Sequence, residues 1–256
     1  MRSLLMKKIK SIKVLDSKIS IVNYEIALSV IEKQIEKKKS HYVCAAAVHL
    51  VMEVYYNPKL QIVVNKSLLT VPDGMPLVWL AKLSGEKHAS RVYGPDLMLK
   101  TCQLAEEKGY KVFLLGGAKN QGKSLKKNLL QKYPKLKVAG VQETPIRPIP
   151  SKENEIILNK IRRSEPQIIF VGLGCPLQEK WMSDNYQRIK KGVLIGVGAA
   201  FDFISGKVKQ APVFMQNLGL EWLFRLYQEP LRLWKRYLIL NSAFVFHIAK
   251  KKLQRL

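Results

Sequence analysis

Two short turns place charged side chains where a bound anion could meet them. Pro72-Asp73-Gly74 follows the apolar run 68–71, and Arg91 ends another short run before a helix-like segment. Ligands of open α/β sheets bind at the carboxyl ends of strands, so Asp73 is placed to present its carboxylate to a cleft. Arg91 is a fixed cation suited to a phosphate at that edge. The alternative for Asp73 is a cap on the helix expected to begin near Met75.

Three glycine-rich turns also follow strand-like runs. They contain Gly116 and Gly117, residues 172–179, and residues 196–202. Backbone N–H groups in such turns can approach a phosphate closely. None of the three has the full GxGxxG pattern, but three turns at one sheet edge predict a nucleotide cleft. By contrast, we interpret Asp96 as the N-cap of a helix beginning near Leu97.

The elements that must position these turns alternate regularly along the chain. Short β-rich apolar runs are separated by amphipathic segments of helical spacing. This alternation predicts an α/β fold, with a Rossmann-like, mostly parallel sheet flanked by helices. The predicted strands are 42–46, 68–71, 112–115, 136–139, 168–171 and 193–195.

Composition narrows the setting in which such a cleft would work. The 256 residues include 44 Lys and Arg against 19 Asp and Glu, giving a net charge of +25 and implying an anionic partner. Three widely spaced cysteines fit a reduced cytoplasm, and without a DxD, HExxH or paired-Cys pattern we expect no metal or other cofactor. The basic N-terminus lacks a signal-peptide core, and the longest apolar stretch, 237–249, is too short to span a bilayer.

The last part of the chain differs from the rest. From residue 211 no strand-like run appears, and between Gly206 and Leu256 ten basic residues face only two acidic ones. Basic helices that also carry Trp, Phe and Tyr are typical of a membrane-surface element, although a solvated helix pair packed on the sheet is the alternative. We therefore expect a core of residues 1–210 and a basic, aromatic helical appendage of residues 211–256.

In its ordered series of motifs the chain resembles the WecG/TagA/CpsF glycosyltransferases. The resemblance extends from about Lys13 to Tyr237. The motifs are Pro72-Asp73-Gly74-Met75-Pro76, Arg91-Val92-Tyr93-Gly94-Pro95-Asp96-Leu97, Gly172-Leu173-Gly174-Cys175-Pro176-Leu177-Gln178-Glu179-Lys180-Trp181, Gly196-Val197-Gly198-Ala199-Ala200-Phe201-Asp202, and Gly219-Leu220-Glu221-Trp222 with Arg225 and Glu229-Pro230.

This resemblance implies metal-independent, inverting transfer of N-acetylmannosamine or a related sugar. The donor would be a UDP-sugar and the acceptor a polyprenyl-diphosphate-linked sugar, in teichoic acid or surface polysaccharide synthesis. It implies that Asp73 is the general base and that Arg225, Arg232 and Lys235 engage a diphosphate. The enzyme would be peripheral on the inner face of the plasma membrane, and homo-oligomerisation is compatible with the sequence. The substrate-binding residues would be Arg91, Gly116, Gly117, Gly174, Pro176, Gln178, Glu179, Gly198 and Asp202.

One position departs from the family. Ala47 stands where the family usually has Asn in a sequence like A-N-V-H, which removes an amide expected to contact the donor sugar. A different donor, or His49 taking over the contact, would offset that loss; otherwise His49 is interpreted as a satisfied core or interface residue. Two alternatives follow: a nucleotide-binding homologue without catalysis, or a basic nucleic-acid-binding protein, although no nucleic-acid-binding module is recognisable.

Overall fold

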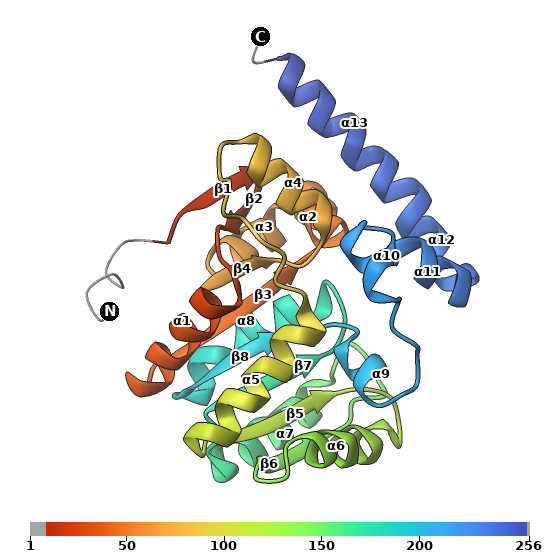
Figure 1. The fold of residues 1–256 in the computed structure, drawn as a ribbon. Helices are drawn as coiled ribbons and strands as arrows, with labels where there is room; N and C mark the ends of the chain where they lie inside the picture. Colours follow the sequence, from red (N-terminus) through yellow and green to blue (C-terminus); the bar gives the residue numbers. More distant parts are fainter. Residues whose placement is uncertain (1–8, 255–256) are drawn as a thin grey trace.

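A six-stranded, fully parallel sheet forms the centre of the computed structural model, which describes residues 9–254 (Figure 1). The strand order is β4-β3-β8-β7-β5-β6. All six strands expected from the sequence are present, and the α/β prediction is confirmed. The strands are β3 (Ser40–Ala46), β4 (Leu69–Pro72), β5 (Lys111–Gly116), β6 (Lys137–Gln142), β7 (Ile168–Gly172) and β8 (Gly192–Gly196).

Helices cover both faces of this sheet, and alternation along β7 shows how. Ile169 and Val171 belong to one buried cluster, whereas Ile168 and Phe170 belong to the other. Both faces are therefore dry, which explains why the strands are continuous apolar runs. The helices of the core are α1 (Tyr24–Glu36), α2 (Val48–Tyr56), α3 (Pro58–Asn65), α4 (Met75–Leu83), α5 (Gly94–Lys108), α6 (Gln121–Lys132), α7 (Ser151–Ser164), α8 (Leu177–Ile189) and α9 (Ala200–Ile204).

An antiparallel hairpin, absent from the sequence prediction, precedes the sheet. It consists of β1 (Ser11–Val14) and β2 (Ser17–Ser20), four residues each. Strands this short, with polar and apolar residues mixed, give no distinct periodic signal. The backbone N–H of Thr70 donates to Ser20 Oγ at 3.1 Å, which attaches the hairpin to β4.

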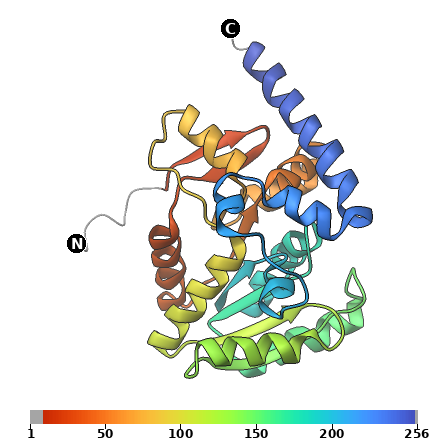
Figure 2. The same ribbon diagram turned by 45° about the vertical axis from the view of Figure 1, so that its right-hand side comes forward.

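The predicted C-terminal region is helical, and no strand follows β8 within residues 9–254. Its last elements follow one another directly and extend away from the sheet, with Phe244 packed into the buried cluster beside α2 (Figure 2). None of the helices in the described part of the chain has the length and apolarity needed to span a bilayer. The elements are α10 (Val213–Asn217), α11 (Glu221–Gln228), α12 (Pro230–Trp234), the π-helical segment η2 (Lys235–Ile239) and α13 (Leu240–Leu253).

Two capping predictions are wrong. Helix α5 begins at Gly94 because Pro95 fixes its first turn, so its N-cap is Tyr93 and not Asp96. Asp96 lies inside that turn, where its carboxylate accepts from the Tyr24 hydroxyl at 3.1 Å. Asp73 does not cap α4, whose N-cap is Gly74.

Candidate active site

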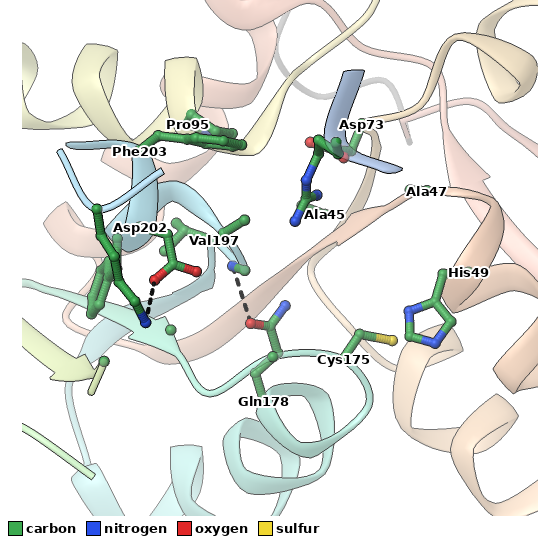
Figure 3. Close-up of a pocket in the computed structure, with 18 of the residues that line it drawn as sticks. Ala45, Ala47, His49, Asp73, Pro95, Cys175, Gln178, Val197, Asp202 and Phe203 are labelled. Carbon is green, nitrogen blue, oxygen red and sulfur yellow. Dashed lines mark hydrogen bonds and ion pairs between the residues drawn. The ribbon is translucent and has the colours of Figure 1, made fainter. Parts of the chain in front are cut away.

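A cavity of about 540 Å³ opens at the carboxyl ends of the parallel strands (Figure 3). Its wall includes Ala45 from β3, Asp73 after β4, Gly117 after β5, Gly172 at the end of β7 and Val197 after β8. The three glycine-rich turns therefore meet at one site, as the sequence predicts. The backbone at Gly116 explains one glycine: its φ is +121°, and a Cβ there would lie 2.5 Å from the Gly172 carbonyl oxygen.

A second cavity of about 110 Å³ adjoins the first and lies under the C-terminal helices. Trp222 and Tyr237 of these helices line it, together with Arg91. The residues that border both cavities are Ala47, His49, Asp73, Glu221, Arg225 and Arg236. Asp73 therefore lies where the two cavities meet.

The Asp73 carboxylate is held by the start of α5. Its Oδ1 accepts from the backbone N–H of Gly94 at 2.5 Å. A Cβ on residue 94 would lie 3.3 Å from both Asp73 Oδ1 and the Val197 carbonyl oxygen, so the glycine permits this close approach. Burial raises the pKa of Asp73 above its ordinary value, and the nearby Arg91 guanidinium partly opposes that rise. A raised pKa makes the ionised carboxylate a stronger base.

Arg91 contacts both Asp73 and a residue of the C-terminal helices. Its Nε donates to the Asp73 carbonyl oxygen at 2.6 Å, and its Nη2 lies 2.5 Å from Glu221 Oε2. The other Glu221 oxygen accepts from the Tyr93 hydroxyl at 2.6 Å, and the guanidinium lies 4.0 Å from the centre of the Tyr93 ring. Arg91 is thus paired with protein groups and borders the smaller cavity, not the larger one.

Gln178 and Glu179, adjacent on α8, differ in position. Gln178 lines the larger cavity, but its Oε1 accepts from Gly198 N at 3.1 Å and its Nε2 donates to Glu179 Oε1 at 2.8 Å. Glu179 is fully buried behind it, and burial raises the pKa of its carboxyl to about 7. Gln178 therefore links two of the glycine-rich turns, while Glu179 does not reach the cavity.

At the opposite end of the larger cavity Asp202 lies near Phe203 (Figure 3). Asp202 Oδ1 accepts from Gln121 Nε2 at 2.9 Å and lies 3.7 Å from Lys207 Nζ. Gln121 in turn accepts from the backbone N–H of Ala118 at 2.8 Å. This network fixes the turn after β5 against α9.

The larger cavity is electropositive, with six cationic and three acidic side chains among the described residues that line it. Arg225 and Arg236 are deeply placed, and the Nε atom of each is buried without a hydrogen-bond partner. Arg232 reaches the rim and pairs with Glu229. Such a cavity suits a ligand with about two phosphate charges. Residues 9–254 contain no group of three or more His, Cys, Asp or Glu side chains placed to hold a metal ion.

Most predicted site residues converge, and four do not. Arg91 borders the smaller cavity. Gly116, Pro176, Glu179 and Lys235 line neither cavity, and Lys235 instead lies over the Trp234 ring, 5.5 Å from its centre. The residues that line the larger cavity are Asp73, Gly117, Gly174, Gln178, Gly198, Asp202, Arg225 and Arg232.

Sequence reasoning did not assign His49, Glu221 or Arg236 to the site. Glu221 is part of the Gly219-Leu220-Glu221-Trp222 motif, so its place in an ordered motif was a usable signal. Arg236 follows Lys235 directly, and only the rotation of the helix decides which of the two faces the cavity. His49 lies two residues after Ala47, on the same side of the chain at the end of β3.

Comparison with known proteins agrees with this geometry. The Glycosyl transferase WecG/TagA/CpsF family matches residues 12–256. A protein of Bacillus subtilis (strain 168), named N-acetylglucosaminyldiphosphoundecaprenol N-acetyl-beta-D-mannosaminyltransferase, is 34% identical over 176 residues, which cover 69% of this chain and 66% of that protein. Proteins of the same name from Bacillus spizizenii (strain ATCC 23059 / NRRL B-14472 / W23) and Staphylococcus aureus (strain MRSA252) are each 30% identical, over 80% and 74% of this chain and 77% and 72% of their own lengths. The chain belongs to the WecG/TagA/CpsF family of glycosyltransferases.

Proposed function

We propose that the protein transfers N-acetylmannosamine, or a closely related sugar, from a UDP-sugar to a polyprenyl-diphosphate-linked sugar. The observation that carries this proposal is the position of Asp73, at the junction of a large electropositive cavity and a smaller one under the C-terminal helices. Two substrates entering from two sides would meet at that carboxylate. The names of the relatives, which specify an N-acetylmannosaminyl group and a diphosphoundecaprenol-linked N-acetylglucosamine, support the choice of substrates.

The reaction is a single displacement at the anomeric carbon of the donor. The acceptor hydroxyl attacks this carbon while Asp73 removes its proton, and the bond to the diphosphate breaks with its electron pair leaving on UDP. The configuration inverts because only one displacement occurs. Arg225 and Arg236, both bordering the junction, would neutralise the charge that develops on the leaving diphosphate.

The C-terminal helices would meet an anionic membrane surface, where a polyprenyl acceptor resides. They expose many large apolar side chains, among them Leu231 at 93% and Tyr227 at 86% exposure. Lys250, Lys251 and Lys252 form the basic last turn of α13. Exposed apolar groups combined with cations suit binding to an anionic lipid interface. The protein would then act as a core of residues 1–210 completed by an appendage of residues 211–256.

The test is release of UDP from UDP-N-acetylmannosamine in the presence of a polyprenyl-diphosphate-linked N-acetylglucosamine. We expect turnover that requires both substrates and that Asp73→Asn largely abolishes. A panel of other UDP-sugars against the same acceptor identifies the preferred donor, which Ala47 makes necessary. Binding of UDP without turnover on any donor and acceptor pair would instead identify a nucleotide-binding homologue without catalysis.

A further inference from the structure

His49 lies in the first turn of α2 at the junction of the two cavities. Its side chain is only 17% exposed. In Figure 3 its ring lies beside Cys175 and below Ala47, on the side of the cavity away from Asp202. The sequence analysis interpreted this residue as a satisfied core or interface histidine, and the structure shows that one ring nitrogen is unsatisfied.

The two ring nitrogens of His49 have different surroundings. Nε2 lies 3.3 Å from Glu53 Oε1, one helical turn further along α2. Nδ1 is buried and has no hydrogen-bond partner among the described residues. Since the carboxylate of Glu53 can only accept, the neutral ring places its proton on Nε2 and leaves a lone pair on Nδ1.

The ring is neutral because its surroundings oppose a positive charge. Burial and the nearby Arg236 guanidinium lower the pKa of His49 to about 3. A group with so low a pKa is a poor general base near neutral pH, so it does not duplicate Asp73. It is instead a fixed hydrogen-bond acceptor at the edge of the cavity.

The chemistry of the acceptor selects its partner. Phosphate oxygens are themselves acceptors and cannot satisfy Nδ1, whereas sugar hydroxyl groups and the N–H of an N-acetyl group donate hydrogen bonds. A buried acceptor without a partner is costly, so a ligand that supplies a donor recovers that cost. Ala47, which borders the same cavities, offers no polar atom of its own side chain.

We propose that His49 is a specificity-determining residue whose Nδ1 accepts a hydrogen bond from a hydroxyl or amide N–H of the sugar bound at the junction. Glu53 is then a positioning residue, since its carboxylate fixes the Nε2–H tautomer. The inference rests on the proposed function, because it assumes that a sugar occupies the junction next to Asp73.

Two substitutions separate the two ring nitrogens. In His49→Asn the side-chain oxygen can take the place of Nδ1, whereas in His49→Gln the amide reaches the place of Nε2 and leaves the Nδ1 position empty. We expect His49→Gln to raise the KM of the contacted sugar substrate about tenfold, the effect of one lost hydrogen bond, while His49→Asn stays within about threefold of wild type. The Kd of UDP alone should be unchanged in both, and circular dichroism and melting should show that both fold.

Separate titrations identify the contacted sugar. A raised Kd for UDP-N-acetylmannosamine points to the donor, and a raised KM for the lipid-linked acceptor alone points to the acceptor. Equal effects of His49→Asn and His49→Gln, no effect of His49→Gln, or a parallel loss of UDP binding would overturn the assignment. Wild-type protein that binds neither a UDP-sugar nor the acceptor would overturn the proposed function and this inference together. Normal wild-type turnover with an unaffected His49→Gln variant would overturn the inference alone.

Discussion

The Arg91 guanidinium lies 2.5 Å from the Glu221 carboxylate, and this ion pair joins the parallel-sheet core to the C-terminal helices. Arg91 also donates from Nε to the Asp73 carbonyl oxygen at 2.6 Å. One guanidinium therefore links the proposed base to α11. Both side chains are largely shielded, at 18% and 12% exposure, so solvent screens the pair weakly.

Breaking this pair should cost stability and loosen the site. Glu221→Gln leaves the Arg91 charge partly buried without a counter-ion, so we expect the free energy of unfolding to fall by about 2 kcal/mol. Denaturant unfolding of Glu221→Gln, Arg91→Gln and the double variant measures the coupling between the two residues. A coupling energy near zero would show that the contact does not hold the C-terminal helices in place.

The pH profile of turnover should report Asp73. Because burial raises its pKa, the ionised base forms only at a pH above the ordinary range for an aspartate, so kcat/KM should rise with pH through that raised value. Asp73→Asn should lower kcat by about 10²–10⁴ and remove this acidic limb. Asp202→Asn serves as a matched carboxylate control: it should alter substrate binding but keep the limb. An unchanged limb in Asp73→Asn would assign it to another group.

Glu179 should make stability depend on pH without taking part in the reaction. The unfolded chain releases this proton near the ordinary pKa of 4.5, whereas the folded protein holds it until a pKa of about 7. Between these values the folded state binds more protons, so the free energy of unfolding falls as pH rises, by roughly 3 kcal/mol at most.

Replacing the carboxyl group removes that dependence. Glu179→Gln should be more stable than wild type at pH 8 and should lack the decline between pH 4.5 and 7. Glu155→Gln, at a half-exposed position of α7, is the control and should behave as wild type. Parallel unfolding curves of Glu179→Gln and wild type across this range would contradict the raised pKa.

Ala47 is the N-cap of α2, and the structure gives it no side-chain cap. An asparagine here could stabilise α2 by accepting from a free backbone N–H, so Ala47→Asn and Ala47→Ser should each raise the free energy of unfolding by about 1 kcal/mol. If the family's Asn also contacts the donor, only Ala47→Asn should lower the KM for the UDP-sugar as well. Melting curves and KM values of the two variants separate capping from contact.

The sequence was sufficient for the sheet because each of its strands is a continuous apolar run. It was sufficient for the glycine-rich turns because the carboxyl ends of parallel strands meet at one edge. It could not separate neighbours on a helix, where successive side chains point about 100° apart. Gln178 reaches the cavity and Glu179 does not, while Arg236 reaches it and Lys235 does not. The Arg91–Glu221 pair spans 130 residues, and no local pattern encodes it.

Membrane binding should depend on the exposed apolar side chains of the C-terminal helices. Deleting residues 211–256 would also remove Phe244 from the core, so point variants give a cleaner test. Leu231 is 93% exposed, and Leu231→Glu should leave the fold intact while weakening binding to anionic lipid vesicles about tenfold or more, the value of one buried leucine.

A matched control lies on the far side of the molecule. Ile156 of α7 is 55% exposed and far from α13 in Figure 1, so Ile156→Glu adds the same charge without touching the proposed membrane face. Vesicle co-sedimentation should separate the two variants, and turnover should fall with Leu231→Glu on a vesicle-embedded acceptor but not on a short-chain soluble one. Equal binding by both variants would show that the exposed apolar groups of α12 do not face the lipid. Loss of turnover on both acceptors would place Leu231 in the active site instead.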